Sequence, residues 1–233
     1  MAVTELPAYV VAGSRPWNRA AFEHFAAERD GERWAFVAQA TELVSTLEEL
    51  DPRFVFFLHW SWMVPPAVTE RWECVCFHMT DVPYGRGGSP LQNLILRGHT
   101  DTVLTALRMT DEIDAGPVYL KCPLSLSGTA EAIYLRATEL SLHLAAEIAG
   151  ATLAPVPQEG APTHFTRRTP AESALPGDAT LDEVVDFIRM LDADGYPRAF
   201  VDHGELRVEL RAATRYADRV EARVVITRRE VSR

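Results

Sequence analysis

Residues 54–58 read Phe-Val-Phe-Phe-Leu, an uninterrupted apolar run between Arg53 and His59. A strand with one face in water alternates apolar and polar residues, whereas a strand buried on both faces is apolar throughout. We therefore expect this segment to be a central strand of a sheet that is covered on both sides.

The segments on either side of this run alternate between strand and helix patterns. Apolar side chains follow a helical spacing in residues 17–28 and 41–50, and short apolar runs read as strands at residues 8–12, 34–38 and 72–77. Such alternation indicates an α/β fold, with a mostly parallel, Rossmann-like sheet and helices on both faces.

Farther along the chain, the pattern predicts a main domain, a linker and a small module. Two more strands (103–109 and 118–123) and a long helix (129–148) complete a domain of residues 1–150. Residues 151–180, rich in Pro, Thr and Gly, read as a linker that wraps over the fold. Residues 181–233 read as a C-terminal β module: a helix opened by a Thr180/Glu183 capping box, then strands at 196–201, 205–212 and 219–226.

Composition narrows the class of partner. The formal net charge is −10 and the pI is about 5.2, so the electrostatic field disfavours a nucleic-acid substrate. The three cysteines lack metal-ligand spacing, and an odd count without a secretory signal is typical of a reducing cytoplasm. No segment reaches the roughly 18 apolar residues of a membrane span. We expect a cytoplasmic protein with no metal, no nucleic acid and no membrane partner.

The strand ends carry the residues suited to chemistry. Open parallel sheets bind ligands beyond the carboxyl ends of their strands, and Gly13, His59 and His78 follow three such ends. Asp114 lies in an acidic turn after the strand at 103–109. An imidazole can move a proton near neutral pH, and a carboxylate within reach can orient it. His78 and Asp114 are therefore the candidate catalytic pair.

At this point the sequence resembles a known family. The segment from His78 to Pro90, HMTDVPYGRGGSP, is similar to the H-x-S-x-L-P-x-x-R-G-x-x-P signature of the folate-dependent formyltransferases. The similarity continues to residues 113–116, IDAG, which resemble the family's L-D-x-G element, and the tail from Leu181 resembles the family's small C-terminal module.

The resemblance implies an enzyme that transfers a formyl group from N10-formyltetrahydrofolate, its co-substrate, to a primary amine without a metal. His78 would take the amine proton and Asp114 would orient the ring. The family has an asparagine two residues before the histidine, and Cys76 stands there in this chain. A thiol is a poor hydrogen-bond donor, so His59, Thr80 or backbone N–H groups are alternatives for polarising the carbonyl. Cys76 itself reads either as a nucleophile or as a small buried residue.

The resemblance also places the two ligands. It implies that the pterin lies between the loop at 59–65 and the turn at 109–114, with contacts from Ser61, Trp62, Met63, Val64, Met109, Asp111 and Ile113. For the acceptor, we name four substrate-binding candidates: Arg15 as a phosphate partner, His59, Thr80 and Arg86. Arg15 can equally belong to an ordinary strand–helix turn, and Arg86 can equally shape its glycine-rich loop.

The acceptor amine stays open at this stage. Length and acidic charge favour a small molecule, most simply an amino sugar linked to a nucleotide, over an RNA. Hydroxyornithine or an amino acid is the alternative acceptor, and a catalytically silent folate- or sugar-binding relative is the alternative class, because Cys76 replaces the asparagine. The strand edges of the C-terminal module predict a homodimer.

Overall fold

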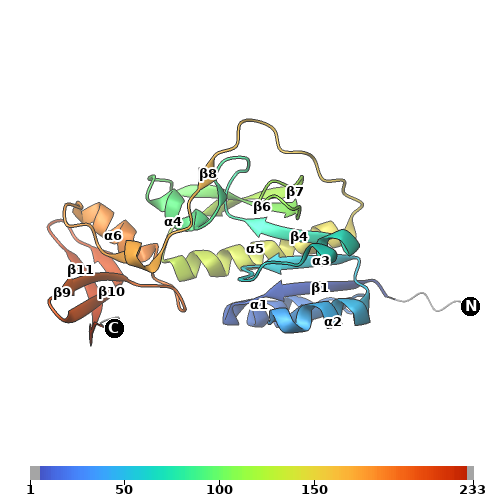
Figure 1. The fold of residues 1–233 in the computed structure, drawn as a ribbon, viewed down its shortest axis with the longest axis horizontal. Coiled ribbons are helices and arrows are strands. Elements are labelled where there is room, and N and C mark those ends of the chain that lie inside the picture. Colours follow the sequence, from blue (N-terminus) through green and yellow to red (C-terminus); the bar gives the residue numbers. More distant parts are fainter. Residues whose placement is uncertain (1–5, 230–233) are drawn as a thin grey trace, which may run out of the picture. The chain divides into compact units, whose positions relative to one another are not determined.

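In the computed structural model, which describes residues 6–229, the chain forms two compact units (Figure 1). Unit 1 contains the described residues up to Arg86, together with residues 103–124 and 135–164. Unit 2 contains residues 87–102 and 125–134 and the described residues from Phe165 onward. All the residues singled out for chemistry in the sequence belong to unit 1.

Unit 1 is built on a six-stranded sheet in the order β2-β1-β3-β4-β6-β7. The strands β2, β1, β3 and β4 are parallel to one another, and β6 is antiparallel to β4. The prediction of a mostly parallel α/β sheet is therefore confirmed. The strand bounds are β1 (Ala8–Gly13), β2 (Arg33–Val37), β3 (Phe54–Leu58), β4 (Cys74–His78), β6 (Asp101–Arg108) and β7 (Val118–Ser125).

The apolar run at residues 54–58 is the interior strand that its composition predicts. All five residues of β3 are buried, and β3 lies between β1 and β4. Its register pairs Phe57 with Cys76, so the carboxyl ends of β3 and β4 lie side by side. The residues that follow these two strands therefore share one edge of the sheet.

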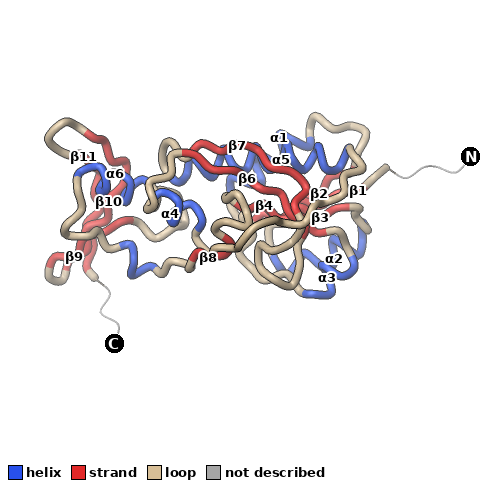
Figure 2. The backbone as a smooth tube through the Cα atoms, turned by 90° about the horizontal axis from the view of Figure 1, so that it is seen from above, coloured by secondary structure: helices blue, strands red, loops and turns tan. Residues whose placement is uncertain are grey.

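Helices cover both faces of this sheet (Figure 2). On one face lie α2 (Ala40–Leu50) and α3 (Pro66–Arg71), whose apolar side chains join those of the strands in a buried cluster. On the other face lie α1 (Pro16–Ala26) and α5 (Ala130–Gly150). Asn18 of α1 donates from Nδ2 to Thr138 Oγ1 of α5 at 3.1 Å, and neither residue is exposed to solvent.

Unit 2 contains a helix on a small antiparallel sheet. The strands β9 (Ala199–His203), β10 (Leu206–Arg215) and β11 (Val220–Arg228) follow the order β11-β10-β9. The predicted capping box opens α6 (Leu181–Arg189): Thr180 Oγ1 accepts from Glu183 N at 3.3 Å, and Glu183 Oε2 accepts from Thr180 N at 2.8 Å. The remaining elements are α4 (Pro90–Ile95), β5 (Arg86–Gly87), β8 (His164–Phe165) and a 3-10 turn at Pro170–Ser173.

Candidate active site

The histidine and the carboxylate singled out in the sequence lie close together. Because β6 is antiparallel to β4, β6 ends beside Val75 at the start of β4, and the turn after β6 folds back to bring Asp114 to His78. β4 ends at His78, which pairs with Thr105 of β6, and Asp114 lies in the turn that follows β6. His78 Nδ1 lies 3.4 Å from Asp114 Oδ2, and the two side chains are only 7% and 14% exposed. A shielded pair of this kind is suited to holding and passing a proton.

The other ring nitrogen of His78 shows where the imidazole carries its proton. His78 Nε2 lies 2.8 Å from the carbonyl oxygen of Gly85. Because a carbonyl oxygen only accepts, Nε2 must be the protonated nitrogen. In the neutral ring, Nδ1 then points its lone pair at Asp114. A transferable proton can be held between Nδ1 and the Asp114 carboxylate.

The turn that carries Asp114 is held by a side chain that sequence reasoning missed. Gln158 Nε2 donates to the carbonyl oxygens of Asp114 and Gly116, both at 2.8 Å. Asp114 adopts a left-handed φ of 54°, and a Cβ on Gly116 would lie 1.8 Å from the carbonyl oxygen of Arg108. Only glycine fits this position, and the Gln158 amide fastens the turn in its unusual backbone conformation.

Arg86 completes this fastening instead of lying in the cavity. Its Nη2 donates to Gln158 Oε1 at 2.8 Å, and its Nη1 pairs with Glu112 Oε1 at 3.2 Å. Arg86 therefore ties the glycine-rich loop to the acidic turn and to the segment around Gln158. This is the loop-shaping alternative that the sequence leaves open.

A cavity of about 710 Å³ lies against the pair, a volume in the range of small-molecule sites. Most of the residues expected to contact the pterin line this cavity: Trp62, Met63, Val64, Met109, Asp111 and Ile113. Ser61 is not among the lining residues, and its hydroxyl lies 2.8 Å from that of Ser14. His59, Cys76 and Asp114 also line the cavity, whereas His78 reaches it only through Asp114.

Cys76 sits in this lining as a neutral thiol. Burial raises its pKa above the ordinary value of a thiol, and the nearby charge of Asp114 raises it further. A thiol is a nucleophile only when it ionises, so the nucleophile reading of Cys76 loses its physical basis at neutral pH. The alternative that agrees with the structure is a small residue filling a strand position, where Cys76 is part-buried and lines the cavity.

His59 is held firmly where it follows β3. Its backbone adopts a left-handed φ of 47°, and Ser14 Oγ donates to its carbonyl oxygen at 2.5 Å. Its Nδ1 lies 3.4 Å from Nδ2 of the buried Asn18. Burial, and then the positive charge of Arg15, lower the pKa of His59 to about 4, so the ring is neutral at physiological pH.

Of the remaining substrate-binding candidates, Thr80 and Arg15 do not line the cavity. Thr80 is fully buried, its Oγ1 donates to the carbonyl oxygen of Gly85 at 3.4 Å, and its own carbonyl accepts from Thr105 at 2.8 Å. It supports the loop that holds His78. Arg15 precedes α1 and acts on His59 through its charge.

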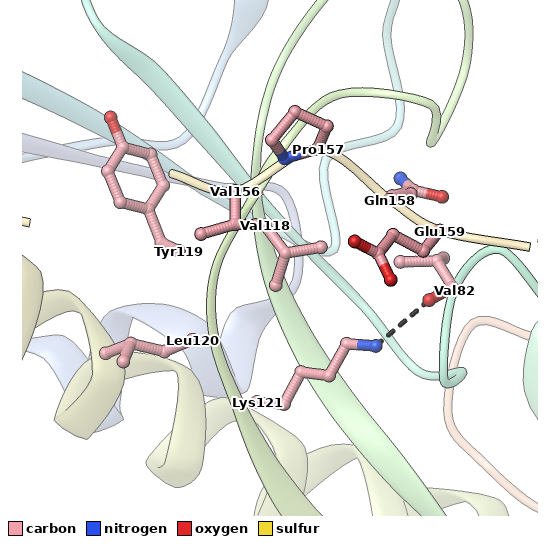
Figure 3. Close-up of a pocket in the computed structure, with 9 residues that line it drawn as sticks. All are labelled: Val82, Val118, Tyr119, Leu120, Lys121, Val156, Pro157, Gln158 and Glu159. Atoms are coloured by element: carbon pink, nitrogen blue, oxygen red, sulfur yellow. Dashed lines mark hydrogen bonds between the residues drawn. The ribbon is translucent and has the colours of Figure 1, made fainter. Parts of the chain in front are cut away.

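A second pocket of about 460 Å³ lies over β7 (Figure 3). Lys121 Nζ donates to the carbonyl oxygen of Val82 at 3.0 Å, as Figure 3 shows, and forms an ion pair with Asp81 at 2.5 Å. Its lining has no imidazole, and its one lysine is already paired. We assign no chemistry to it.

Neither a metal-binding cluster nor a membrane-spanning helix is found within residues 6–229. No group of three or more His, Cys, Asp or Glu side chains is placed to hold a metal ion in this part of the chain. No helix within the same residues has the length and apolar character needed to cross a bilayer. All three cysteines are free thiols.

Comparison with known proteins places this geometry in a family. Residues 170–227 match the family described as methionyl-tRNA formyltransferase, C-terminal domain. A solved methionyl-tRNA formyltransferase from Clostridium thermocellum is 37% identical with a TM-score of 0.93, over 96% of this chain and 100% of that one. The chain belongs to the folate-dependent formyltransferase family. The resemblance indicated by the His78–Pro90 motif is thus confirmed.

Other members of the family match less of the chain or at lower identity. The methionyl-tRNA formyltransferase of Legionella pneumophila strain Paris is 31% identical over 105 residues, which are 43% of this chain and 33% of that protein. The chain thus matches about a third of this curated relative's length. A sugar N-formyltransferase from Shewanella has a TM-score of 0.71 at 14% identity, over 91% of this chain and 100% of its own, and shares the fold.

Proposed function

We propose that the protein is an N-formyltransferase that moves a formyl group from N10-formyltetrahydrofolate to a primary amine. The observation that carries this proposal is the shielded His78–Asp114 pair, which presents its carboxylate to a cavity of about 710 Å³. Membership in the formyltransferase family supports the class of reaction. The cavity volume and its mixed apolar and acidic lining suit a pterin ring.

In the proposed reaction, the amine nitrogen attacks the formyl carbon and the bond from that carbon to N10 breaks. The amine must lose one proton, and N10 of the departing tetrahydrofolate must gain one. Asp114 faces the cavity and is the first acceptor, while Nδ1 of His78, 3.4 Å away, shares the proton. The pair then returns the proton to N10, so no net charge accumulates. This order differs from the sequence expectation, in which the imidazole itself meets the amine.

The pterin of the folate is proposed to bind between two walls of the cavity. Trp62, Met63 and Val64 form one wall, and Met109, Asp111 and Ile113 form the other. Met63 is 82% exposed and Ile113 is 62% exposed, so both walls offer apolar surface that a bound ring would cover. Ser61 would contribute by fixing the first wall through Ser14.

The acceptor is proposed to be a small amine, with a nucleotide-linked amino sugar as the first choice. The net charge of −10 favours a small molecule over an RNA. The methionyl-tRNA in the names of the 37% identical relative and of the Legionella protein is the second choice. Hydroxyornithine or an amino acid is the third, and a silent binding module is the alternative without chemistry.

We also propose a homodimer and a cytoplasmic location. Val224, Val225 and Ile226 of the outer strand β11 are 52%, 41% and 59% exposed, which supports pairing between two copies. The three free thiols support a reducing compartment.

The proposal is tested by incubating the protein with N10-formyltetrahydrofolate and each acceptor class in turn. Release of tetrahydrofolate together with an acceptor heavier by one formyl group supports the enzyme. Binding of the folate without turnover on any acceptor identifies the silent module instead. His78→Ala should remove the formylated product, and unchanged turnover in this variant would exclude the proposed pair.

A further inference from the structure

Formyl transfer creates a negative charge on an oxygen, and the cavity needs a hydrogen-bond donor to meet it. Attack on the formyl carbon turns the carbonyl oxygen into an oxyanion, and removing one donor from such a site typically costs about 10²–10³-fold in rate. Cys76 lines the cavity but carries only a weak donor. Two other lining donors are already used: Arg108 pairs with Glu73, and Thr110 Oγ1 donates to the carbonyl oxygen of Glu112 at 3.1 Å.

Three rings in residues 59–62 carry an N–H group, and all three line the cavity. Trp62 is 41% exposed, so water competes for its N–H. Trp60 Nε1 is covered by protein atoms and has no hydrogen-bond partner among the described residues, so it does not reach a ligand in this conformation. His59 lines the same cavity as Cys76 and Asp114. It follows β3 directly, two residues after Phe57, and Phe57 is the register partner of Cys76. His59 is therefore placed beside the strand end where the weak thiol donor stands.

A chain of hydrogen bonds fixes which nitrogen of His59 carries the proton. The backbone N–H of Arg15 donates to Asn18 Oδ1 at 3.0 Å, so this atom is an acceptor and Nδ2 is the amide nitrogen. Asn18 Nδ2 can only donate hydrogen bonds, and its neighbours are Thr138 Oγ1 at 3.1 Å and His59 Nδ1 at 3.4 Å. His59 Nδ1 must accept, and the neutral ring then carries its hydrogen on Nε2.

The same surroundings keep the His59 ring uncharged and its backbone fixed in position. Burial and the charge of Arg15 hold the pKa of His59 near 4, so the ring gains no proton above about pH 5. Its backbone is fixed by the 2.5 Å bond from Ser14 Oγ. A donor whose proton, charge and position are set before the substrate arrives is what stabilisation of a transition-state oxyanion requires.

We propose that His59 donates a hydrogen bond from Nε2 to the formyl oxygen as its negative charge develops, in place of a donor at position 76. The proposal rests on the formyl transfer proposed above. It makes His59 a catalytic donor and Asn18 the residue that positions it.

The test compares His59→Ala with the double variant His59→Ala/Cys76→Asn, using N10-formyltetrahydrofolate and the acceptor that the wild type formylates. His59→Ala should lower kcat by about 10²–10³-fold with little change in KM for the folate. Adding Cys76→Asn should restore at least tenfold of that loss, because an amide N–H₂ then reaches the same oxygen from β4. His59→Gln, which keeps a neutral donor, should retain more activity than His59→Ala.

The controls separate this proposal from the function it rests on. The exposed His24→Ala should match the wild type, and melting temperatures show whether each variant is folded. A wild type without turnover on any acceptor refutes the proposed function itself. An active wild type with an equally active His59→Ala variant overturns the role of His59. Folded His59→Ala that is slow but is not rescued by Cys76→Asn also overturns it, because a structural role would give that result.

Discussion

The ends of β3 and β4 each carry a histidine, and the two differ in what holds them. In His78, one ring nitrogen lies 2.8 Å from the carbonyl oxygen of Gly85 and the other lies 3.4 Å from the Asp114 carboxylate, so both nitrogens face acceptors. Burial, and then the positive charge of Arg15, lower the pKa of His59 to about 4, and its Nδ1 faces the amide nitrogen of Asn18. The comparison indicates that burial and neighbouring groups, and not the side chain alone, decide whether a histidine is suited to proton transfer or to hydrogen-bond donation.

Removing the Asp114 carboxylate should have the largest effect on turnover. Asp114→Asn keeps the size of the side chain but removes the carboxylate beside His78, which leaves no proton acceptor and no counter-charge at that position. We expect kcat to fall by about 10²–10⁴-fold, the usual contribution of a general acid–base group, with the folate still bound. Single-turnover rates and folate titration measure the two quantities separately. Turnover within twofold of the wild type would show that Asp114 does not take the proton.

A second substitution, at Asn18, removes the hydrogen bond that holds the His59 ring. Asn18→Ala removes the amide that donates to His59 Nδ1 and to Thr138 Oγ1. We expect an unfolding free energy lower by about 1–3 kcal/mol, measured by urea denaturation. We also expect kcat to fall less than in His59→Ala, because a ring with the wrong tautomer still samples the right one. A kcat loss equal to that of Asp114→Asn would contradict the division between the two histidines.

The pH dependence of stability separates the two histidines further. The pKa of His59 is lowered in the folded protein, so its unfolded state binds a proton that the native state rejects. The stability from this group is complete above its unfolded value of about 6.5 and is lost as pH falls toward 4. Relative to the wild type, His59→Phe should therefore lose less melting temperature between pH 7 and pH 4.5. An equal fall in melting temperature between pH 7 and pH 4.5 in the two proteins would show that His59 is not held neutral.

The smallest effect is expected for Cys76→Asn alone. If His59 already meets the oxyanion, a second donor at position 76 changes kcat by no more than about twofold to threefold, far below the 10²–10³ of a missing donor. Steady-state kinetics of the single variant are sufficient for this measurement. A gain of a hundredfold would show instead that the wild-type cavity lacks a donor.

Local patterns were sufficient to predict the sheet and the proximity of His78 to Asp114. The FVFFL run is apolar on both faces and is therefore buried on both. The motif from His78 onward indicates a histidine beside a carboxylate, although the antiparallel β6 brings Asp114 to His78 through its turn and not through a shared strand end. These inferences depend on residues near one another in sequence or on strands whose order the pattern implies. They survive because strand pairing converts such spacing directly into distance.

Long-range side-chain contacts explain what the sequence could not supply. Gln158 fastens the Asp114 turn from 44 residues away, and Asn18 meets Thr138 across 120 residues. No periodicity relates such positions, so Gln158 was read only as part of a linker. For Arg86, the sequence left substrate binding and loop shaping equally open, because its partners Gln158 and Glu112 could not be foreseen.

The hold of Gln158 on Asp114 also has a consequence for the order in which the protein matures. The ribosome makes the sheet strands and Asp114 well before it makes Gln158, which follows 44 residues later. A nascent chain can therefore bury its hydrophobic centre while the acidic turn is still unfastened. The active conformation of the Asp114 turn would then form late in synthesis, after the sheet has folded.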